Sequence, residues 1–328
     1  MPVDPVLAPL LPVPPLPDDP DWPQLRASDA EQVGTFVGRF TQPAPDGVDR
    51  RVISLPVDGG EIDLVVHTPA ATGPLPVHIY LHGGGWTAGS ASNAFVDVVG
   101  AERAAGAGCV VVAVDYRKAP EHPYPVALTD CLAALTWVLG HADELGVDPS
   151  TVTVGGVSSG ANLAAALCLK NRDTGGPEIA LQVLEVPTVD LTLSLPSHGD
   201  ASLGSDYALQ RVDVDRLIPL YLGEGGSPHD PYVSPLLAAD HSRLPPAVIL
   251  SAEYDLLRDD GPAYARVLRA AGTPALASVR PGHVHVSHGL TALMPSAAQW
   301  RDDVLAALRA AHEGSLEGHL GGRLEEAR

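Results

Sequence analysis

A serine between two glycines lies in the stretch of the chain whose residue types could do chemistry most directly. The stretch reads Gly-Val-Ser-Ser-Gly over Gly156–Gly160, after the β-branched run Thr151–Gly155 and before the helix formers Ala161–Leu167. This order predicts a strand, a tight turn and a helix, and such a turn would hold Ser158 in a strained backbone that exposes its hydroxyl. Glycines fit on both sides because side chains there would collide with the neighbouring strand and helix. We therefore expect Ser158 to be a nucleophile.

A glycine triplet could supply exposed backbone N–H groups. His-Gly-Gly-Gly-Trp at His82–Trp86 follows the apolar run Val77–Leu81. The N–H groups of Gly84 and Gly85, together with that of Ser159 after the nucleophile, could converge on the oxyanion of an acyl-transfer reaction. The alternative is a plain flexible turn, which the place of the triplet directly after an apolar strand disfavours.

Several ordered segments resemble the signature segments of one enzyme family. The four main ones are His82–Trp86, Asp115–Pro125, Gly156–Gly160 and Asp255–Gly261, and they are supported by Asp230–Leu237 and Leu244–Pro246. In this order they resemble the hormone-sensitive-lipase-like carboxylesterases, also called bacterial family IV esterases, which are α/β-hydrolases. The resemblance runs from roughly residue 50 to residue 312. It implies a serine esterase with a catalytic acid, a histidine base and an oxyanion hole.

The resemblance places the catalytic acid at Asp255, the first residue of an Asp-x-Leu-x-Asp segment. The run Ala247–Glu253 before it predicts a buried parallel strand, and acids at the carboxyl ends of such strands point into the ligand crevice. Asp259 and Asp260 open the predicted helix Gly261–Ala271, where negative charge complements the helix dipole.

Glu185 is the main rival to Asp255 as the acid. It lies within the apolar strand Leu181–Val186, with Asp190 just beyond. A carboxylate in so apolar a strand must be paired or must border a cavity. We prefer Asp255 because its whole segment agrees with the family pattern.

The base is one of three histidines near the end of the resembling region, His283, His285 and His288. The family pattern is Pro-Gly, two further residues and then the catalytic histidine, which implies His285. The family usually continues with Gly-Phe, where this chain has Val286 and Ser287. The other two histidines are interpreted as loop or pocket-rim residues, because a lone histidine is usually structural.

These placements define a mechanism. His285 would take the proton of Ser158 in the transition state, while Asp255 orients the imidazole and stabilises its charged form. The side chain of Ser159 is interpreted as a cap of the following helix. No metal or organic cofactor is needed for any step.

The order of apolar runs predicts an α/β-hydrolase fold, in which a mostly parallel, doubly wound sheet carries a helical cap. Predicted strands are Ile62–His67, Val77–Leu81, Cys109–Asp115, Thr151–Val154, Leu181–Val186, Ala247–Glu253 and Ala275–Arg280. Predicted helices include Ser28–Phe40, Val126–Leu139, Asn162–Leu169, Val214–Leu222 and Ala297–Ala311.

We expect four kinds of segment along the chain. Residues 51–187 and 230–312 form the catalytic domain, residues 1–50 an N-terminal cap segment, residues 188–229 a cap insertion and residues 313–328 a flexible tail. Candidate lid or pocket residues, most of which could simply pack the cap, are Leu7, Leu10, Leu11, Trp22, Phe36, Tyr207, Leu217 and Tyr221.

The composition limits the partners. Twenty basic and 40 acidic residues give a formal net charge of −20, which opposes binding to nucleic acid or to an anionic membrane and disfavours anionic substrates. No apolar run is long enough to span a membrane. Cys109, Cys131 and Cys168 have no metal-like spacing, and their apolar settings together with the lack of a signal-peptide pattern indicate a cytoplasmic protein with reduced thiols.

The sequence therefore predicts a serine carboxylesterase for uncharged esters with short to medium acyl groups, the acyl range being implied by the resemblance alone. Two alternatives stay open: an amidase or lactonase with the same triad, and a non-catalytic ligand-binding homologue. Retention of Ser158, Asp255 and a correctly spaced His285 argues against the binding protein. The resemblance also suggests a homodimer, although no sequence feature requires one.

Overall fold

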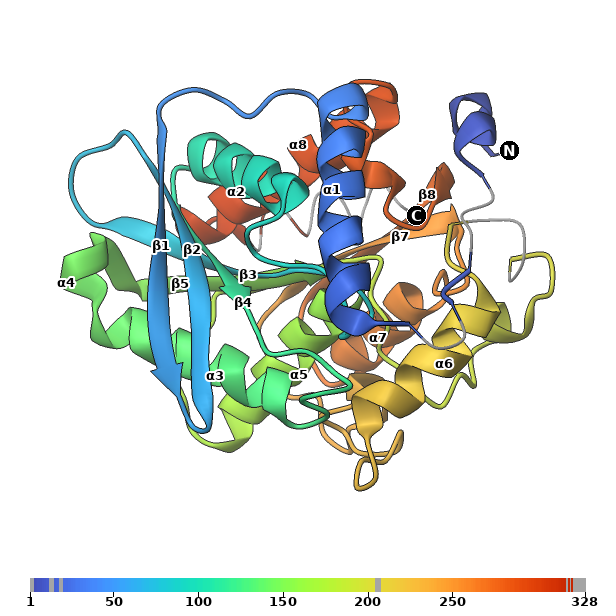
Figure 1. The fold of residues 1–328 in the computed structure, drawn as a ribbon. Helices are drawn as coiled ribbons and strands as arrows, with labels where there is room; N and C mark the ends of the chain where they lie inside the picture. The colour runs from blue at the N-terminus through green and yellow to red at the C-terminus, as the bar shows by residue number, and fades with distance from the viewer. Residues whose placement is uncertain are drawn as a thin grey trace.

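One eight-stranded sheet forms the centre of the computed structural model, which describes residues 3–11, 15–17, 20–203, 208–316, 318 and 320. The strand order is β1-β2-β4-β3-β5-β6-β7-β8 (Figure 1). The strands are β1 (Val48–Val57), β2 (Gly60–Pro69), β3 (Leu75–Leu81), β4 (Val110–Asp115), β5 (Val147–Val157), β6 (Leu181–Glu185), β7 (Ala247–Tyr254) and β8 (Ala275–Val284). β1 pairs antiparallel with β2, and β2 pairs antiparallel with β4, whereas all the other neighbouring pairs are parallel.

Helices cover both faces of the sheet (Figure 1). One face carries α2 (Ala94–Ala107) and α8 (Pro295–His312), and the other carries α3 (Val126–Gly140), α5 (Ser159–Asp173) and α7 (Asp260–Ala270). The short helices are α4 (Ala142–Leu145), η1 (Pro5–Leu10), η2 (Pro196–Gly199), η3 (Pro235–Leu237) and η4 (Ser287–Gly289). This arrangement confirms the predicted doubly wound α/β-hydrolase sheet.

Alternation along β3 shows why the sheet has two cores. Val77, Ile79 and Leu81 are fully buried in the core beneath α3 and α5, while Tyr80 between them is fully buried in the core beneath α2 and α8. Successive side chains of a strand point to opposite faces, so a strand covered on both sides is apolar throughout. The continuous apolar runs of the sequence therefore mark the central strands correctly.

The outer elements were predicted less well. Strand β1 was missed, because this exposed edge strand mixes charged and apolar residues. Helix α1 (Trp22–Phe40) begins six residues before the predicted Ser28. Its start is explained by Asp21, whose carboxylate accepts the N–H of Gln24 at 3.0 Å, and by Pro23 in the first turn.

The N-terminal segment and α6 (Arg211–Leu222) contact each other, as Figure 1 shows at the lower end of α1. The N–H of Leu16 donates to Asp213 at 2.8 Å, and Arg216 donates to the carbonyl of Leu16 at 2.5 Å. The two segments predicted to form a cap are thus tied together, although the division into domains stays a prediction.

The candidate lid residues have different surroundings. Leu7 is buried against Val284 and Leu290, and Leu10, Leu11 and Phe36 pack against the same cluster. Trp22 lies beneath the guanidinium of Arg26, 6.0 Å from the ring centroid, and Tyr207 lies outside the described residues. Leu217 and Tyr221 pack on the loop after β3 and are described with the site.

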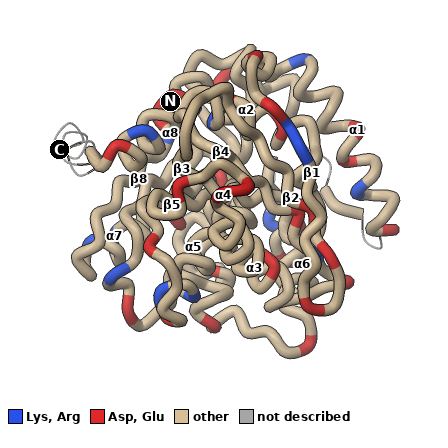
Figure 2. Tube along the Cα trace, turned by 90° about the vertical axis from the view of Figure 1, so that its left-hand side faces the viewer, with Lys and Arg blue, Asp and Glu red and all other residues tan. Residues whose placement is uncertain are grey.

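Charge is distributed as the composition predicts. Acidic residues are scattered along the tube in Figure 2, with fewer basic residues between them. None of the helices among the described residues is long and apolar enough to cross a membrane. All three cysteines are buried free thiols. Two residues of the segment predicted to be a flexible tail, Leu316 and Leu320, are buried against the core beneath α2 and α8.

Candidate active site

Ser158 occupies the sharp turn between β5 and α5. Its φ of 56° and ψ of −120° lie outside the regions that serine normally adopts. Neighbouring backbone lies so close on both sides of the turn that a Cβ would not fit there. A Cβ at Gly156 would lie 2.5 Å from the carbonyl oxygen of Gly160, and a Cβ at Gly160 would lie 2.1 Å from the carbonyl oxygen of Leu81. The predicted strand, turn and helix are therefore present, with glycine required at both flanking positions.

An unbroken hydrogen-bonded chain links Ser158, His285 and Asp255. The Nε2 atom of His285 lies 2.9 Å from the Oγ of Ser158. The Nδ1 atom of the same imidazole lies 2.7 Å from the Oδ2 of Asp255. The other carboxylate oxygen of Asp255 accepts the N–H of Leu257 at 3.0 Å. Asp255 is 2% exposed and His285 is 7% exposed, so the pair is shielded from water.

Three parallel strands bring these side chains together. Ser158 follows β5, Asp255 follows β7 and His285 follows β8. The carboxyl ends of parallel strands lie at one edge of the sheet, which is where open α/β sheets bind ligands. His285 precedes Val286, whose φ of 56° is unusual for a β-branched residue and turns the chain after the histidine.

The loop after β3 lies beside the serine turn. Gly84 has a φ of 125°, and a Cβ there would lie 2.3 Å from the carbonyl oxygen of Ala88. Gly85 has a φ of 59°. Within the described part of the chain, no acceptor is bonded to the N–H groups of Gly84, Gly85 or Ser159. These three donors are therefore available to an incoming oxygen.

A partly buried acid, Asp115, contacts residues on both sides of the same loop. Asp115 lies 2.7 Å from the Nζ of Lys118 and 3.4 Å from the Nε2 of His82. Burial opposes ionisation of Asp115, but His82 and the ammonium of Lys118 outweigh burial and hold the pKa of its carboxyl well below the usual range. Asp115 also accepts the N–H of Ala91 at 3.3 Å. The carboxylate thereby joins the ends of β3 and β4.

Residues of α6 and α1 contact the loop after β3 directly. The ring of Tyr221 in α6 stacks on Trp86, with centroids 4.4 Å apart. A Cβ at Gly85 would lie 2.6 Å from Leu217, so α6 sits tightly against this glycine. From α1, Arg26 donates to the carbonyl of Thr87 at 2.7 Å. Sequence analysis missed Arg26, because nothing local in a mixed polar helix marks one arginine as an anchor.

Glu185 is not part of the hydrogen-bonded chain. Its carboxylate forms an ion pair with Arg103 and accepts the indole N–H of Trp300 at 3.0 Å, on the face of the sheet covered by α2 and α8. The requirement that this glutamate be paired is met. Asp190 accepts hydrogen bonds from the hydroxyls of Thr192 and Ser194 and so stabilises a turn.

The other two histidines are structural in this geometry. His283 is 1% exposed and lies between the hydroxyls of Ser287 and Ser296, at 2.8 and 3.0 Å. His283 is therefore an interior residue of β8, not the loop or pocket-rim residue that was expected. His288 stacks on Trp300 with centroids 5.2 Å apart and lines a small cavity. Burial lowers the pKa of both imidazoles to about 4.

Two further expectations need correction. The hydroxyl of Ser159 does not cap α5, because Ser158 is the N-cap residue and makes no side-chain capping bond. Asp260 does more than complement the helix dipole. It is fully buried, accepts the N–H of Val189 at 2.7 Å and pairs with His198 at 2.6 Å. The carboxylate thus connects α7 to the chain after β6.

A family model described as the alpha/beta hydrolase fold matches residues 78–289, a range that contains Ser158, Asp255, His285 and the loop after β3. The chain belongs to the α/β-hydrolase family.

Relatives of this α/β-hydrolase include named esterases. Carboxylesterase NlhH of Mycobacterium tuberculosis is 43% identical over 249 residues, which are 74% of this chain and 76% of that protein. The arylesterase of Saccharolobus solfataricus is 32% identical over 291 residues, which are 88% of this chain and 93% of that protein. A solved hyperthermophilic esterase from the archaeon Pyrobaculum calidifontis matches with a TM-score of 0.85 at 32% identity, covering 94% of this chain and 99% of that one. These comparisons confirm the resemblance to carboxylesterases.

Proposed function

We propose that this α/β-hydrolase is a serine carboxylesterase of the hormone-sensitive-lipase-like group, with Ser158 as nucleophile, His285 as base and Asp255 as orienting acid. The observation that carries the proposal is the hydrogen-bonded chain from Asp255 through His285 to the strained Ser158. The esterase relatives and structural neighbours support the reaction class.

In the first half of the reaction, Nε2 of His285 takes the proton of Ser158 as its Oγ attacks the ester carbonyl carbon. Asp255 accepts the Nδ1–H of His285 and stabilises the imidazolium that forms. The tetrahedral intermediate then collapses, and the alcohol leaves with the proton held by His285. The product of this half is an ester of Ser158. Water deprotonated by His285 attacks that ester, and His285 returns the proton to the Oγ of Ser158 as the bond to Ser158 breaks and the carboxylic acid is released.

The oxyanion of each tetrahedral intermediate would accept hydrogen bonds from the N–H groups of Gly84, Gly85 and Ser159. Support comes from the positive φ angles of Gly84 and Gly85 and from the absence of other acceptors at these N–H groups among the described residues. Fixed backbone donors stabilise the transition state without reorganising as charge develops.

The substrate class we propose is uncharged esters with short to medium acyl groups. The net charge of −20 disfavours anionic substrates. Residues 1–50 and 188–229 would form the cap over the site, which the contacts of Leu217 with Gly85 and of Arg26 with Thr87 support. We also propose a cytoplasmic location and retain the homodimer as the proposed assembly, which sedimentation would test.

The test is hydrolysis of p-nitrophenyl esters from acetate to palmitate by the wild type, His285→Ala and His288→Gln. We expect turnover to peak at short chains, to disappear in His285→Ala and to stay within about an order of magnitude of wild type in the matched control His288→Gln. Persistent turnover in His285→Ala would exclude His285 as the base.

A folded wild type that hydrolyses none of these esters would exclude the carboxylesterase. Parallel assays with p-nitroanilides and lactones would then separate an amidase or lactonase from a binding protein. Ligand binding without turnover on any of these substrates is the result expected of the binding protein.

A further inference from the structure

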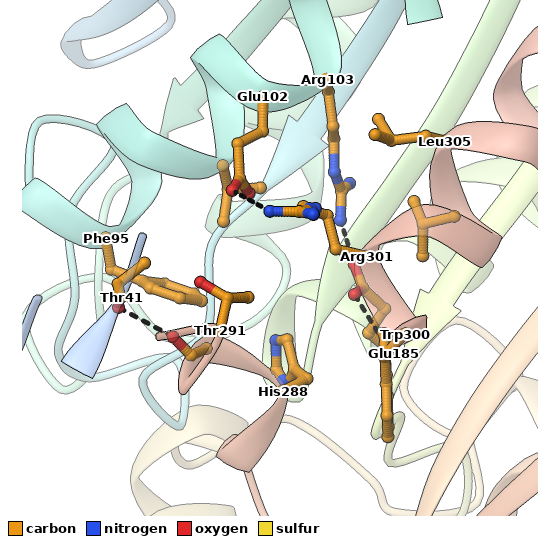
Figure 3. A pocket seen from close by; sticks show the side chains of 13 residues that line it. Thr41, Phe95, Glu102, Arg103, Glu185, His288, Thr291, Trp300, Arg301 and Leu305 are labelled. Atoms are coloured by element: carbon orange, nitrogen blue, oxygen red, sulfur yellow. Dashed lines mark hydrogen bonds and ion pairs between the residues drawn. The ribbon is translucent and has the colours of Figure 1, made fainter. Parts of the chain in front are cut away.

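A buried charged cluster lies behind the serine turn, on the face of the sheet covered by α2 and α8. Glu185 at the end of β6 pairs with Arg103 from α2 and accepts the indole N–H of Trp300 from α8 at 3.0 Å (Figure 3). Both charged side chains are 5% exposed or less. Arg103 also lies 3.0 Å from the Nε2 of His78 and 4.5 Å from the ring centroid of Tyr80.

Both members of the pair are charged. Burial alone would raise the pKa of Glu185, but the guanidinium of Arg103 and the indole N–H outweigh it, so the pKa is lowered. Burial likewise opposes the charge of Arg103, and the Glu185 carboxylate raises the pKa of the guanidinium above its usual value. Ionic pairs buried this deeply often contribute little net stability, because desolvation offsets their attraction. The presence of the buried pair of Glu185 and Arg103 therefore needs an explanation other than stability.

The cluster is joined to the nucleophile through one peptide group. The carbonyl oxygen of Glu185 accepts the N–H of Ser158 at 2.9 Å, continuing the β5–β6 pairing by one residue. The next residue, Val186, has a φ of 40°, which is an outlier for a β-branched side chain. Two strained residues are thus joined to Glu185: Ser158 by a backbone hydrogen bond and Val186 by the next peptide bond. Strain of this kind persists only where the surroundings over-determine the backbone.

The cavity beside the cluster is too small to be a substrate pocket. Its volume is about 30 Å³, and its wall includes Glu185, His288 and Trp300 (Figure 3). That space holds about one water molecule. The charged cluster thus borders a cavity smaller than an ester, and the hydrogen bond that links it to Ser158 is made by the backbone carbonyl of Glu185.

We propose that Glu185 is a positioning residue, whose carboxylate, held by Arg103 and Trp300, fixes the backbone carbonyl that orients Ser158. The inference rests on the proposed function, because it assigns the cluster to the same ester hydrolysis. Two anchors from α2 and α8 prevent the end of β6 from shifting. Small displacements of a nucleophile are costly, since about 1 Å of misplacement can lower a rate about a hundredfold.

The central test is Glu185→Gln, which keeps the size of the side chain and removes its charge. We expect kcat per titrated active site to fall about tenfold with KM unchanged, and phosphonylation of Ser158 by an uncharged p-nitrophenyl phosphonate to slow by a similar factor. A purely structural role would lower the unfolding midpoint and leave both rates per folded site at wild-type values. That result would overturn the proposal.

The matched control is Asp130→Asn. Asp130 is fully buried and pairs with Arg117 at 2.7 Å, but it has no hydrogen bond to the serine turn. We expect this variant to lose stability with kcat unchanged. The double variant Arg103→Leu/Glu185→Leu removes both buried charges and should regain stability while kcat stays low. A wild-type kcat in the double variant would contradict the proposal.

Trp300→Phe keeps the test decisive if Glu185→Gln does not fold. It removes the hydrogen bond to Glu185 and keeps an aromatic ring at this position, and we expect kcat to fall about threefold with KM unchanged. An unchanged kcat there would count against the positioning role. Failure of the proposed function is distinguishable, because the wild type would then show neither ester turnover nor phosphonylation of Ser158.

Discussion

Two buried pairs of an acid and a base lie at the ends of neighbouring strands, yet only one of them has the connections of a catalytic device. Asp255 follows β7 and pairs with His285, while Glu185 ends β6 and pairs with Arg103. Both carboxylates are at most 3% exposed. The difference lies in the partner. An imidazole has a second nitrogen that can exchange a proton with Ser158, whereas a guanidinium keeps its proton at any pH that the protein tolerates.

The face of the sheet decides which partner each acid meets. The side chain of Glu185 points between α2 and α8, where Arg103 and Trp300 enclose it. Asp255 lies beyond the end of its strand, where the loop after β8 can bring His285 against it. Burial and charge pairing therefore do not distinguish the two carboxylates. What distinguishes Asp255 is a partner that can exchange protons and that also reaches Ser158.

Replacing the nucleophile should give the largest effect. Ser158→Ala should lower kcat/KM for p-nitrophenyl acetate by about 10⁴-fold or more, because no covalent intermediate can form. Folding should be unchanged, as judged by circular dichroism and the melting temperature. Substantial turnover in this variant would remove Ser158 from the mechanism and leave the Asp255 and His285 pair without a function.

Neutralising each acid in turn tests the comparison most directly. Asp255→Asn should lower kcat by about 10³- to 10⁴-fold, because the imidazole loses the carboxylate that fixes its tautomer and stabilises its charged form. The matched change Glu185→Gln should cost only about tenfold. Initial rates with active-site titration measure both. Equal losses in the two variants would show that the two pairs do not differ in the way proposed.

A change in the glycine loop should give an intermediate loss. Gly84→Ala places a Cβ 2.3 Å from the carbonyl oxygen of Ala88 at a φ of 125°, so the loop must shift. Loss of oxyanion donors costs about 10²- to 10³-fold in kcat. The control Gly47→Ala has a similarly positive φ but open space around it, so it should lose stability alone. A Gly84→Ala enzyme with normal kcat would exclude this part of the oxyanion hole.

The smallest effect concerns stability and involves the two buried histidines His283 and His288. Burial lowers the pKa of His283 and His288 to about 4 in the folded state, against about 6.5 when unfolded. Between these values the unfolded chain binds more protons, so stability should fall as pH drops from 6.5 towards 4. His288→Gln should remove about half of that dependence. Urea unfolding across this range measures it, and an unchanged slope would contradict the neutral, buried state of His288.

Much of the fold and the core of the site could be predicted because the relevant signals are local. The strand, turn and helix around Ser158 are encoded in consecutive residues, and continuous apolar runs marked the central strands. The resemblance supplied Asp255 and His285, which the structure brings to hydrogen-bond distance of each other and of Ser158. Edge strand β1 and the first turn of α1 were missed, because exposed elements carry mixed side chains that give little pattern.

The sequence by itself determined the order of the central strands along the chain, the serine turn and the need for Glu185 to be paired. Only the tertiary structure decided that Arg103, 82 residues away, is its partner, that Trp300 is its hydrogen-bond donor and that His283 and His288 are interior. Local motifs fix backbone geometry over a few residues. Pairing across such distances depends on which helix covers which face of the sheet, and that is settled only when the two cores pack.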